Sequence, residues 1–153
     1  MAYERSVEHL SGAPSQGLRA EARTRLTKAL VGLGRVAEAR LQAETARAEV
    51  APHDVLTLAT AAAALAAVMD AERRADEADQ LYREALGTIG PTGYALIRMG
   101  IQRDYASFLI DSGRGAEAKP LLEEVRAFYD TPATPFERQR TEALLQRCAA
   151  VSR

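Results

Sequence analysis

The sequence predicts an all-α protein, a right-handed stack of antiparallel helical hairpins with seven to eight helices. Three Glu-Ala pairs (Glu38-Ala39, Glu77-Ala78 and Glu117-Ala118) recur at intervals of 39 and 40 residues, each just after a short link. The chain is 47% hydrophobic but only 5% aromatic, because much of its apolar content is alanine, the best helix former. No segment alternates with a period of two, so no strand is expected. A period near 40 residues indicates stacked supersecondary units.

Residues 15–33 and 36–50 are the first predicted pair of helices. Leu26 and Leu30 are one helical turn apart in the first segment, and Ala39, Ala43 and Ala46 share one face of the second. Gly34 separates the two segments, since glycine commonly follows the last turn of a helix.

Residues 55–69 open the second pair, and Asp54 before them is a predicted N-cap. Nearly every residue of this segment is apolar or small, so we expect it to be buried on several sides at the centre of the core. An amphipathic partner follows Arg73-Arg74. The Gly-rich segment 87–93 is the clearest turn signal in the chain.

Residues 94–110 and 116–129 make the third pair, with Ser112-Gly113 in the link. Pro120 lies about one turn inside the second of these helices and predicts a local irregularity, because proline lacks the N–H of an intrahelical bond. Thr134-Pro135-Phe136-Glu137 is a start signal for a last helix that ends near Val151, and Tyr3–Leu10 is expected to form an eighth helix.

The length of 153 residues fits one domain. We expect a single domain over residues 1–153, with repeats over residues 15–51, 54–90 and 91–130 and a capping helix over residues 134–151.

Composition argues against nucleic-acid and membrane partners. Lys plus Arg (20) nearly balances Asp plus Glu (21). The net charge of -1 therefore gives no overall attraction to nucleic acid or to an anionic membrane. Binding of RNA by helical repeats would also need a basic stripe with stacking aromatic residues. The most apolar run, Leu56–Met69, is too short to span a bilayer. The single Cys148 fits a small buried side chain in a reducing compartment, and the polar start of the chain shows no export signal, so we expect a cytoplasmic protein.

No residue pattern predicts catalysis, a metal site or a cofactor. The two histidines, His9 and His53, have no further ligand at metal-binding spacing. Asp76, Glu77 and Asp79 are explained by the positive end of a helix dipole. The segment 87–93 lacks the lysine and the preceding strand of a phosphate-binding loop. We therefore expect that the protein is not an enzyme.

The register of the three pairs resembles that of tetratricopeptide repeats. The positions that carry the resemblance are the bulky–small pairs of each first helix, the residue at the turn and the early alanine of each second helix: Leu26-Thr27, Leu65-Ala66 and Tyr105-Ala106; Gly34, Arg73 and Gly113; Ala39, Ala78 and Ala118. The resemblance spans residues 15–130. The family's usual unit has 34 residues, so the longer units here are closer to the long-helix variant found in kinesin light chains and bacterial signalling proteins.

The resemblance implies a module that binds a peptide or a neighbouring domain in a concave groove, as part of a bacterial regulatory or signalling protein. The groove-facing positions that it implies, besides two alanines, are Thr24, Lys28, Val31, Asp70, Arg103, Ser107 and Ile110. Arg103 is suited to a partner's carboxylate, and we expect Arg103→Glu to weaken binding with little change in melting temperature. The chain contains no Asn, which argues against the asparagine clamp that some family members use for chaperone C-termini.

A second hypothesis makes the chain a structural element, either a homodimer or a rigid spacer without a ligand groove. Exposed apolar residues on a terminal helix would favour it.

Overall fold

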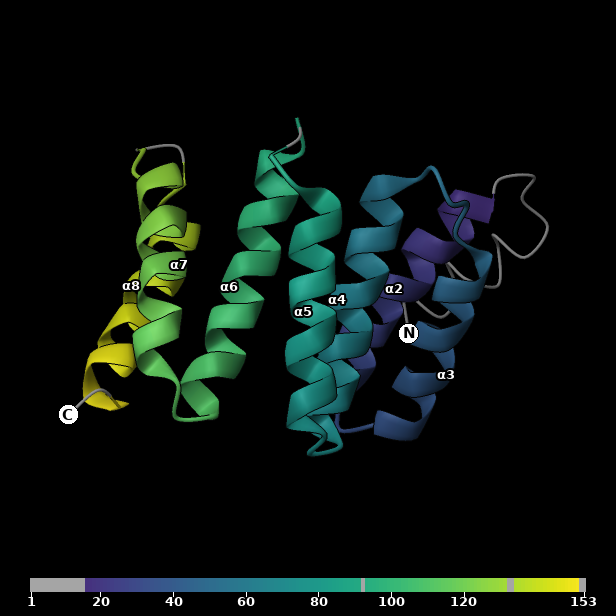
Figure 1. Ribbon diagram of the computed structural model, residues 1–153, viewed down its shortest axis with the longest axis horizontal. Helices are drawn as coiled ribbons and strands as arrows, with labels where there is room; N and C mark the ends of the chain where they lie inside the picture. Colours follow the sequence, from purple (N-terminus) through teal and green to yellow (C-terminus); the bar gives the residue numbers. More distant parts are fainter. Residues whose placement is uncertain (1–15, 92, 132–133, 152–153) are drawn as a thin grey trace. The chain divides into compact units, whose positions relative to one another are not determined.

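The computed structural model describes residues 16–91, 93–131 and 134–151, and over these residues the chain is helical without strands (Figure 1). Its seven helices are α2 (Gln16–Gly32), α3 (Val36–Glu49), α4 (Val55–Ala71), α5 (Ala75–Ile89), α6 (Ala95–Asp111), α7 (Gly115–Phe128) and α8 (Pro135–Val151). Consecutive helices pack as the pairs α2–α3, α4–α5 and α6–α7, which confirms the predicted all-α class. The expected helix Tyr3–Leu10 lies outside the described residues.

The chain divides into two compact units, one up to residue 92 and one from residue 93. The N-terminal unit contains α2 to α5, and the C-terminal unit contains α6 to α8. The boundary falls in the link between the second and third predicted repeats. A single domain and a right-handed stack remain predictions.

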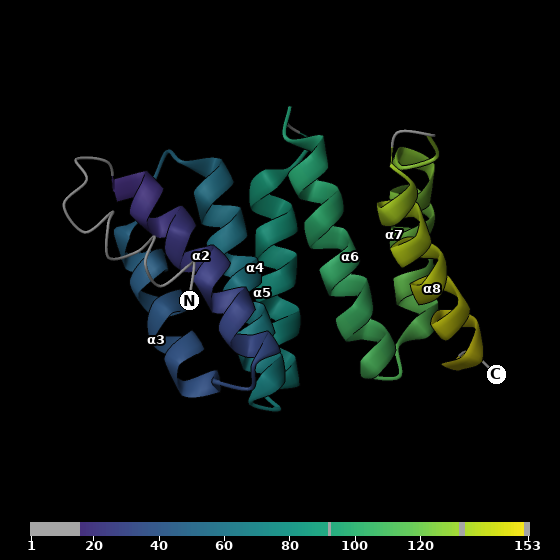
Figure 2. The ribbon, with the colours of Figure 1, turned by 180° about the vertical axis from the view of Figure 1, so that it is seen from behind.

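Helix α4 is the centre of the N-terminal unit. It packs against α2, α3 and α5, and Figure 2 shows α2 lying across it. Its buried side chains are mostly alanines, which let neighbouring helices approach closely. The backbone N–H of Thr57 donates to the carboxylate of Asp54 (3.0 Å), which is the predicted N-cap. The predicted central position of this segment is confirmed.

The three helix-ending turns share one backbone geometry. The second residue after α2, α4 and α6 has a left-handed conformation: φ is +72° at Gly34, +62° at Arg73 and +76° at Gly113. The next N–H bonds back to the carbonyl five residues earlier, at 2.9 Å after α2 and α4 and 2.7 Å after α6. This is the Schellman arrangement, which satisfies carbonyls that a helix end would leave unpaired.

An arginine–glutamate pair follows each of these turns. Arg35 donates from Nε and Nη2 to the two carboxylate oxygens of Glu38 at 2.7 and 2.6 Å. The same fork joins Arg74 to Glu77 at 2.5 Å and Arg114 to Glu117 at 2.7 Å. Each glutamate lies in the first turn of the following helix, where the helix dipole favours a negative charge. The alanine after each glutamate is fully buried at the helix crossing, as the Glu-Ala register predicts.

The C-terminal unit packs α6, α7 and α8 against one another. Met99, Val125 and Tyr129 form a buried cluster within it. Cys148 is buried as predicted, and its thiol donates to the carbonyl of Gly115 at 2.9 Å. Helix α7 runs through Pro120 without a break, so the predicted irregularity does not interrupt the helix.

The predicted turn over residues 87–93 begins too early. Helix α5 continues to Ile89, whose side chain is fully buried, and Gly90 then ends the helix with a positive φ of +49°. Burial of an isoleucine outweighs the weak helix propensity of Gly87.

Candidate functional site

Four of the predicted groove residues belong to the N-terminal unit. Lys28 is exposed, and Val31 and Asp70 are partly exposed. Thr24 is only 4% exposed, and its hydroxyl donates to the carbonyl of Ala20 at 2.9 Å. The prediction that Thr24 faces a groove is therefore wrong, because its side chain is buried and its hydroxyl is hydrogen-bonded within α2.

The other three predicted residues belong to the C-terminal unit. Ser107 is partly exposed, whereas Ile110 is buried and does not offer a surface for a partner. The side chain of Arg103 is 12% exposed, and its Nη1 donates to the carboxylate of Glu137 on α8. The carboxylate that the sequence assigned to a partner thus comes from the same chain. Because of this ion pair, we expect Arg103→Glu to lower the stability of the C-terminal unit, in place of the small change expected from the sequence.

A partly buried polar layer surrounds Arg103 in the C-terminal unit. Gln102 donates to Glu124 at 2.7 Å, and Arg98 lies 3.6 Å from the same carboxylate. Burial is the main cause that lowers the pKa of Arg103, and the positive charge of Arg140 is the second. Among the described residues, Oε1 of Gln102 and Nε of both Arg98 and Arg103 have no hydrogen-bond partner. These contacts link α6 to α7 and α8, so the layer contributes to the stability of the C-terminal unit.

The N-terminal unit has a hollow of about 310 Å³ between α3 and α5. Helices α3 and α5 each pack against α4, and within the described part of this unit they do not pack against each other. We call this hollow the α3–α5 groove. Its lining residues are Arg40, Glu44, Leu65, Met69, Arg74, Glu77, Gln80, Leu81 and Glu84.

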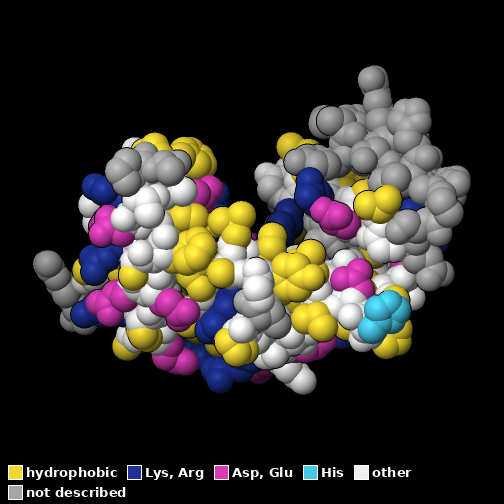
Figure 3. All heavy atoms as spheres, turned by 90° about the horizontal axis from the view of Figure 1, so that it is seen from above, with side chains coloured by type: hydrophobic (Ala, Val, Ile, Leu, Met, Phe, Trp, Pro, Cys, Tyr) yellow, Lys and Arg dark blue, Asp and Glu magenta, His cyan; other side chains and the backbone are white. Residues whose placement is uncertain are grey.

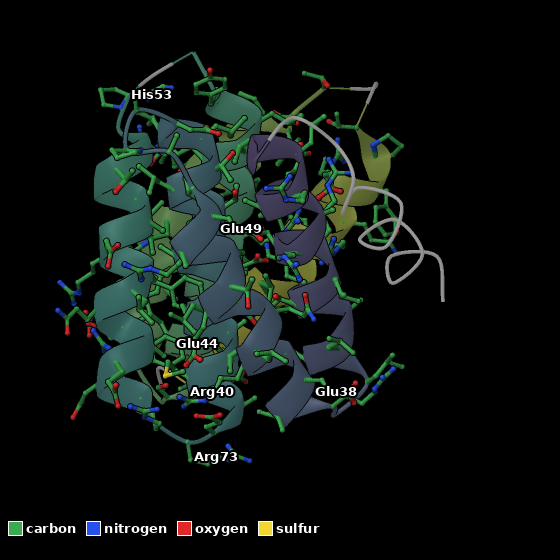
Figure 4. The ribbon with its side chains drawn as sticks, turned by 90° about the vertical axis from the view of Figure 1, so that its right-hand side faces the viewer. Glu38, Arg40, Glu44, Glu49, His53 and Arg73 are labelled. Atoms are coloured by element: carbon green, nitrogen blue, oxygen red, sulfur yellow. The ribbon has the colours of Figure 1, made fainter. Side chains whose placement is uncertain are left out.

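Arg40 lies at one end of the α3–α5 groove and holds an ion-pair network. Its Nε donates to Glu72 at 2.7 Å, its Nη2 donates to the other oxygen of that carboxylate, and its Nη1 donates to Glu44 at 3.2 Å. Arg74 lies 3.5 Å from Glu72. The hydrogen bond from Arg40 is the main cause that lowers the pKa of Glu72, and the same bond raises the pKa of Arg40. Figure 4 shows Arg40 and Glu44 one above the other on α3, over the turn that holds Arg73.

A second ion pair crosses the α3–α5 groove. Nη2 of Arg47 on α3 donates to Glu84 on α5 at 2.8 Å. Neither this pair nor the Arg40–Glu72 pair has a local sequence pattern, because the partners are 37 and 32 residues apart. The i,i+4 spacing of Arg40 and Glu44 was the one visible signal.

One histidine, His53, lies among the described residues. His53 is exposed in the link between α3 and α4 (Figures 3 and 4). Figure 3 shows basic and acidic side chains interspersed on the face it presents. Over the described ranges, no group of three His, Cys, Asp or Glu side chains could hold a metal ion. Within those ranges no helix combines the length and the apolarity needed to cross a membrane.

The fold and the groove define an all-α protein of paired helices with a charged, partly apolar surface hollow. Comparison of the chain with family models, with curated proteins and with solved structures finds no match. The tetratricopeptide resemblance accordingly depends on the residues of this chain alone.

Proposed function

We propose that the chain is a non-catalytic protein–protein interaction module made of tetratricopeptide-like hairpins. The proposal is supported by one helix-ending turn that occurs in all three hairpins. Each copy has a left-handed residue, at positions 34, 73 and 113, and a bidentate Arg–Glu pair directly after it. A hairpin repeated in one register presents an extended surface, and such surfaces bind peptides or neighbouring domains.

The partner we propose is a peptide or an adjoining domain in a cytoplasmic, bacterial regulatory or signalling system. Lys28, Val31 and Asp70 belong to the accessible part of the N-terminal unit, so they remain candidates for this contact. Thr24 and Ile110 are left out because they are buried.

Affinity capture with a matched pair of variants tests this function. Lys28→Glu reverses a charge on α2, and Lys119→Glu reverses one on the exposed side of α7, where Lys119 lies 3.9 Å from Glu123. We expect quantitative mass spectrometry of proteins captured from lysate to show partners that bind the unaltered chain and Lys119→Glu but not Lys28→Glu. Identical captured sets for all three chains would contradict the proposal.

A second candidate function is self-association as a structural element. Phe136 and Val151 on α8 are 66% and 44% exposed, which is large for apolar side chains on a terminal helix. Light scattering over a concentration series should then show dimers that Phe136→Ser abolishes. A monomer at every concentration would refute this candidate.

A further inference from the structure

We propose that the α3–α5 groove binds a basic side chain, lysine or arginine, of a partner polypeptide. This inference rests on the proposed function in taking the partner to be a protein. It goes beyond that function by naming a different surface and the chemistry that the surface selects.

The floor of the groove suits the aliphatic stem of such a side chain. Met69 is buried and Leu65 and Leu81 are partly exposed, and these three side chains line the hollow on α4 and α5. The volume of about 310 Å³ is at the lower end of the range for ligand pockets. Lysine and arginine bury their methylene stems on apolar surface while the charged end stays near polar groups.

The guanidinium groups at the groove already have carboxylates from the same chain. Arg40 directs all three nitrogens at Glu72 and Glu44. Arg74 directs two at Glu77 and lies within 3.5 Å of Glu72 with the third. An anionic ligand would have to displace these contacts, so the groove disfavours acidic side chains.

Two carboxylates at the groove still have an oxygen that can accept a hydrogen bond. Glu44 and Glu84 each accept one arginine bond, through Oε1, and within the described residues no donor reaches Oε2 of either carboxylate. The exposed amide of Gln80 makes no hydrogen bond to the side chain of a described residue, and it offers an acceptor oxygen and two N–H donors. The two free carboxylate oxygens, which only accept, are what favour a cationic donor.

The charged side chains at the groove carry a net negative charge, which also favours a cation. Among the lining residues, three carboxylates face two guanidinium groups: Glu44, Glu77 and Glu84 against Arg40 and Arg74. A positively charged group with N–H donors would therefore satisfy the free carboxylate oxygens of the groove. The apolar floor favours a long basic side chain over a bare ion.

Titration with four capped peptides tests the inference. The peptides Ala-Ala-X-Ala-Ala carry lysine, arginine, norleucine or glutamate at X, and the readout is the ¹⁵N–¹H spectrum of the full chain. We expect the lysine and arginine peptides to shift the amides of Gln80, Leu81 and Glu44, with norleucine at least about tenfold weaker and glutamate without effect. Equal binding of norleucine and lysine would overturn the inference, and so would the absence of shifts at millimolar peptide.

A matched pair of variants locates the contact. Glu44→Gln removes a carboxylate whose side chain is 54% exposed and pairs with Arg40 at i,i+4 spacing, and Glu21→Gln does the same on α2, where Glu21 is 48% exposed and pairs with Arg25. Binding of the lysine peptide should fall about fivefold in Glu44→Gln and stay unchanged in Glu21→Gln. Equal affinity in both variants would remove Glu44 from the site and overturn the inference. Partner capture that depends on Lys28 but not on Glu44 would leave the proposed function standing while this inference fails.

Discussion

Exchange of glycine and non-glycine residues at the helix-ending turns should change stability in opposite directions. Arg73 holds φ at +62°, in the region where a Cβ meets the following carbonyl, while Gly34 and Gly113 hold the same conformation without that contact. We therefore expect Arg73→Gly to stabilise the N-terminal unit. We expect Gly34→Ala and Gly113→Ala to destabilise their units.

The magnitude follows from two opposing terms. A side chain in the left-handed region costs about 1–2 kcal/mol, and glycine adds about 0.4–1 kcal/mol of freedom to the unfolded chain. The net gain for Arg73→Gly is then about 0.5–1 kcal/mol, with a loss of similar size for each alanine variant. A Cβ built on Gly34 or Gly113 meets no atom within 4 Å beyond its own residue and its chain neighbours, so the loss comes from the local backbone conformation and not from a clash with the rest of the unit.

Urea unfolding followed by circular dichroism measures these differences. The chain has two compact units, so transitions should be fitted separately where they resolve. Gly100→Ala is the matched control: Gly100 is inside α6, has open space around it and does not have a left-handed φ. Alanine should stabilise there by about 0.5–1 kcal/mol through helix propensity. If Gly113→Ala and Gly100→Ala shift stability with the same sign, the backbone explanation is refuted.

Three other changes test the packing and the ion pairs. Ala78→Leu should overpack the α4–α5 crossing and lower the unfolding free energy by about 1–3 kcal/mol, and a neutral result in chemical unfolding would contradict the register. Because the pKa of Glu72 beside Arg40 is below its ordinary value near 4.5, its ionised form stabilises the fold. The stability lost in Glu72→Gln should be complete above the ordinary pKa near 4.5 and should shrink as the pH falls through the lowered pKa of Glu72, and a pH-independent difference in urea titrations would refute the pairing. Arg103→Glu should lower the melting temperature, with a loss of about 2–3 kcal/mol, because it places two carboxylates together in a partly buried layer. The reversed pair Arg103→Glu/Glu137→Arg should restore part of that stability, and failure of this rescue would contradict the contact.

The sequence predicted the helices well where burial and local signals agree. The apolar segment 55–69 became α4, since a helix that is apolar all round must be surrounded. The turn predicted over residues 87–93 begins too early because three glycines mark this segment as a local turn, whereas Ile89 gains from burial against the rest of the unit. Such tertiary burial has no local signature.

The candidate site was less predictable, because helical period gives the face of a helix but not the partner of a side chain. Arg103 and Glu137 are 34 residues apart, and only the packing of α8 on α6 brings them together. The arginine forks, in contrast, could have been found. Arg35, Arg74 and Arg114 each precede a Glu-Ala pair by the same number of residues. That constant spacing is a sequence signal for the N-cap geometry of the second helices.

Internal repetition also separates the residues of the fold from those of the surface. The arginine of each fork and the alanine at each crossing are the same in all three hairpins, and both kinds of residue fix the helix pairs. Arg40, in contrast, corresponds at intervals of 39 and 40 residues to Asp79 and then Lys119. Stability therefore requires no particular charge at this position, yet in the first hairpin its arginine organises the carboxylates of the α3–α5 groove. A position that varies between hairpins while shaping a hollow is where a repeat protein can acquire a specific partner without disturbing its fold.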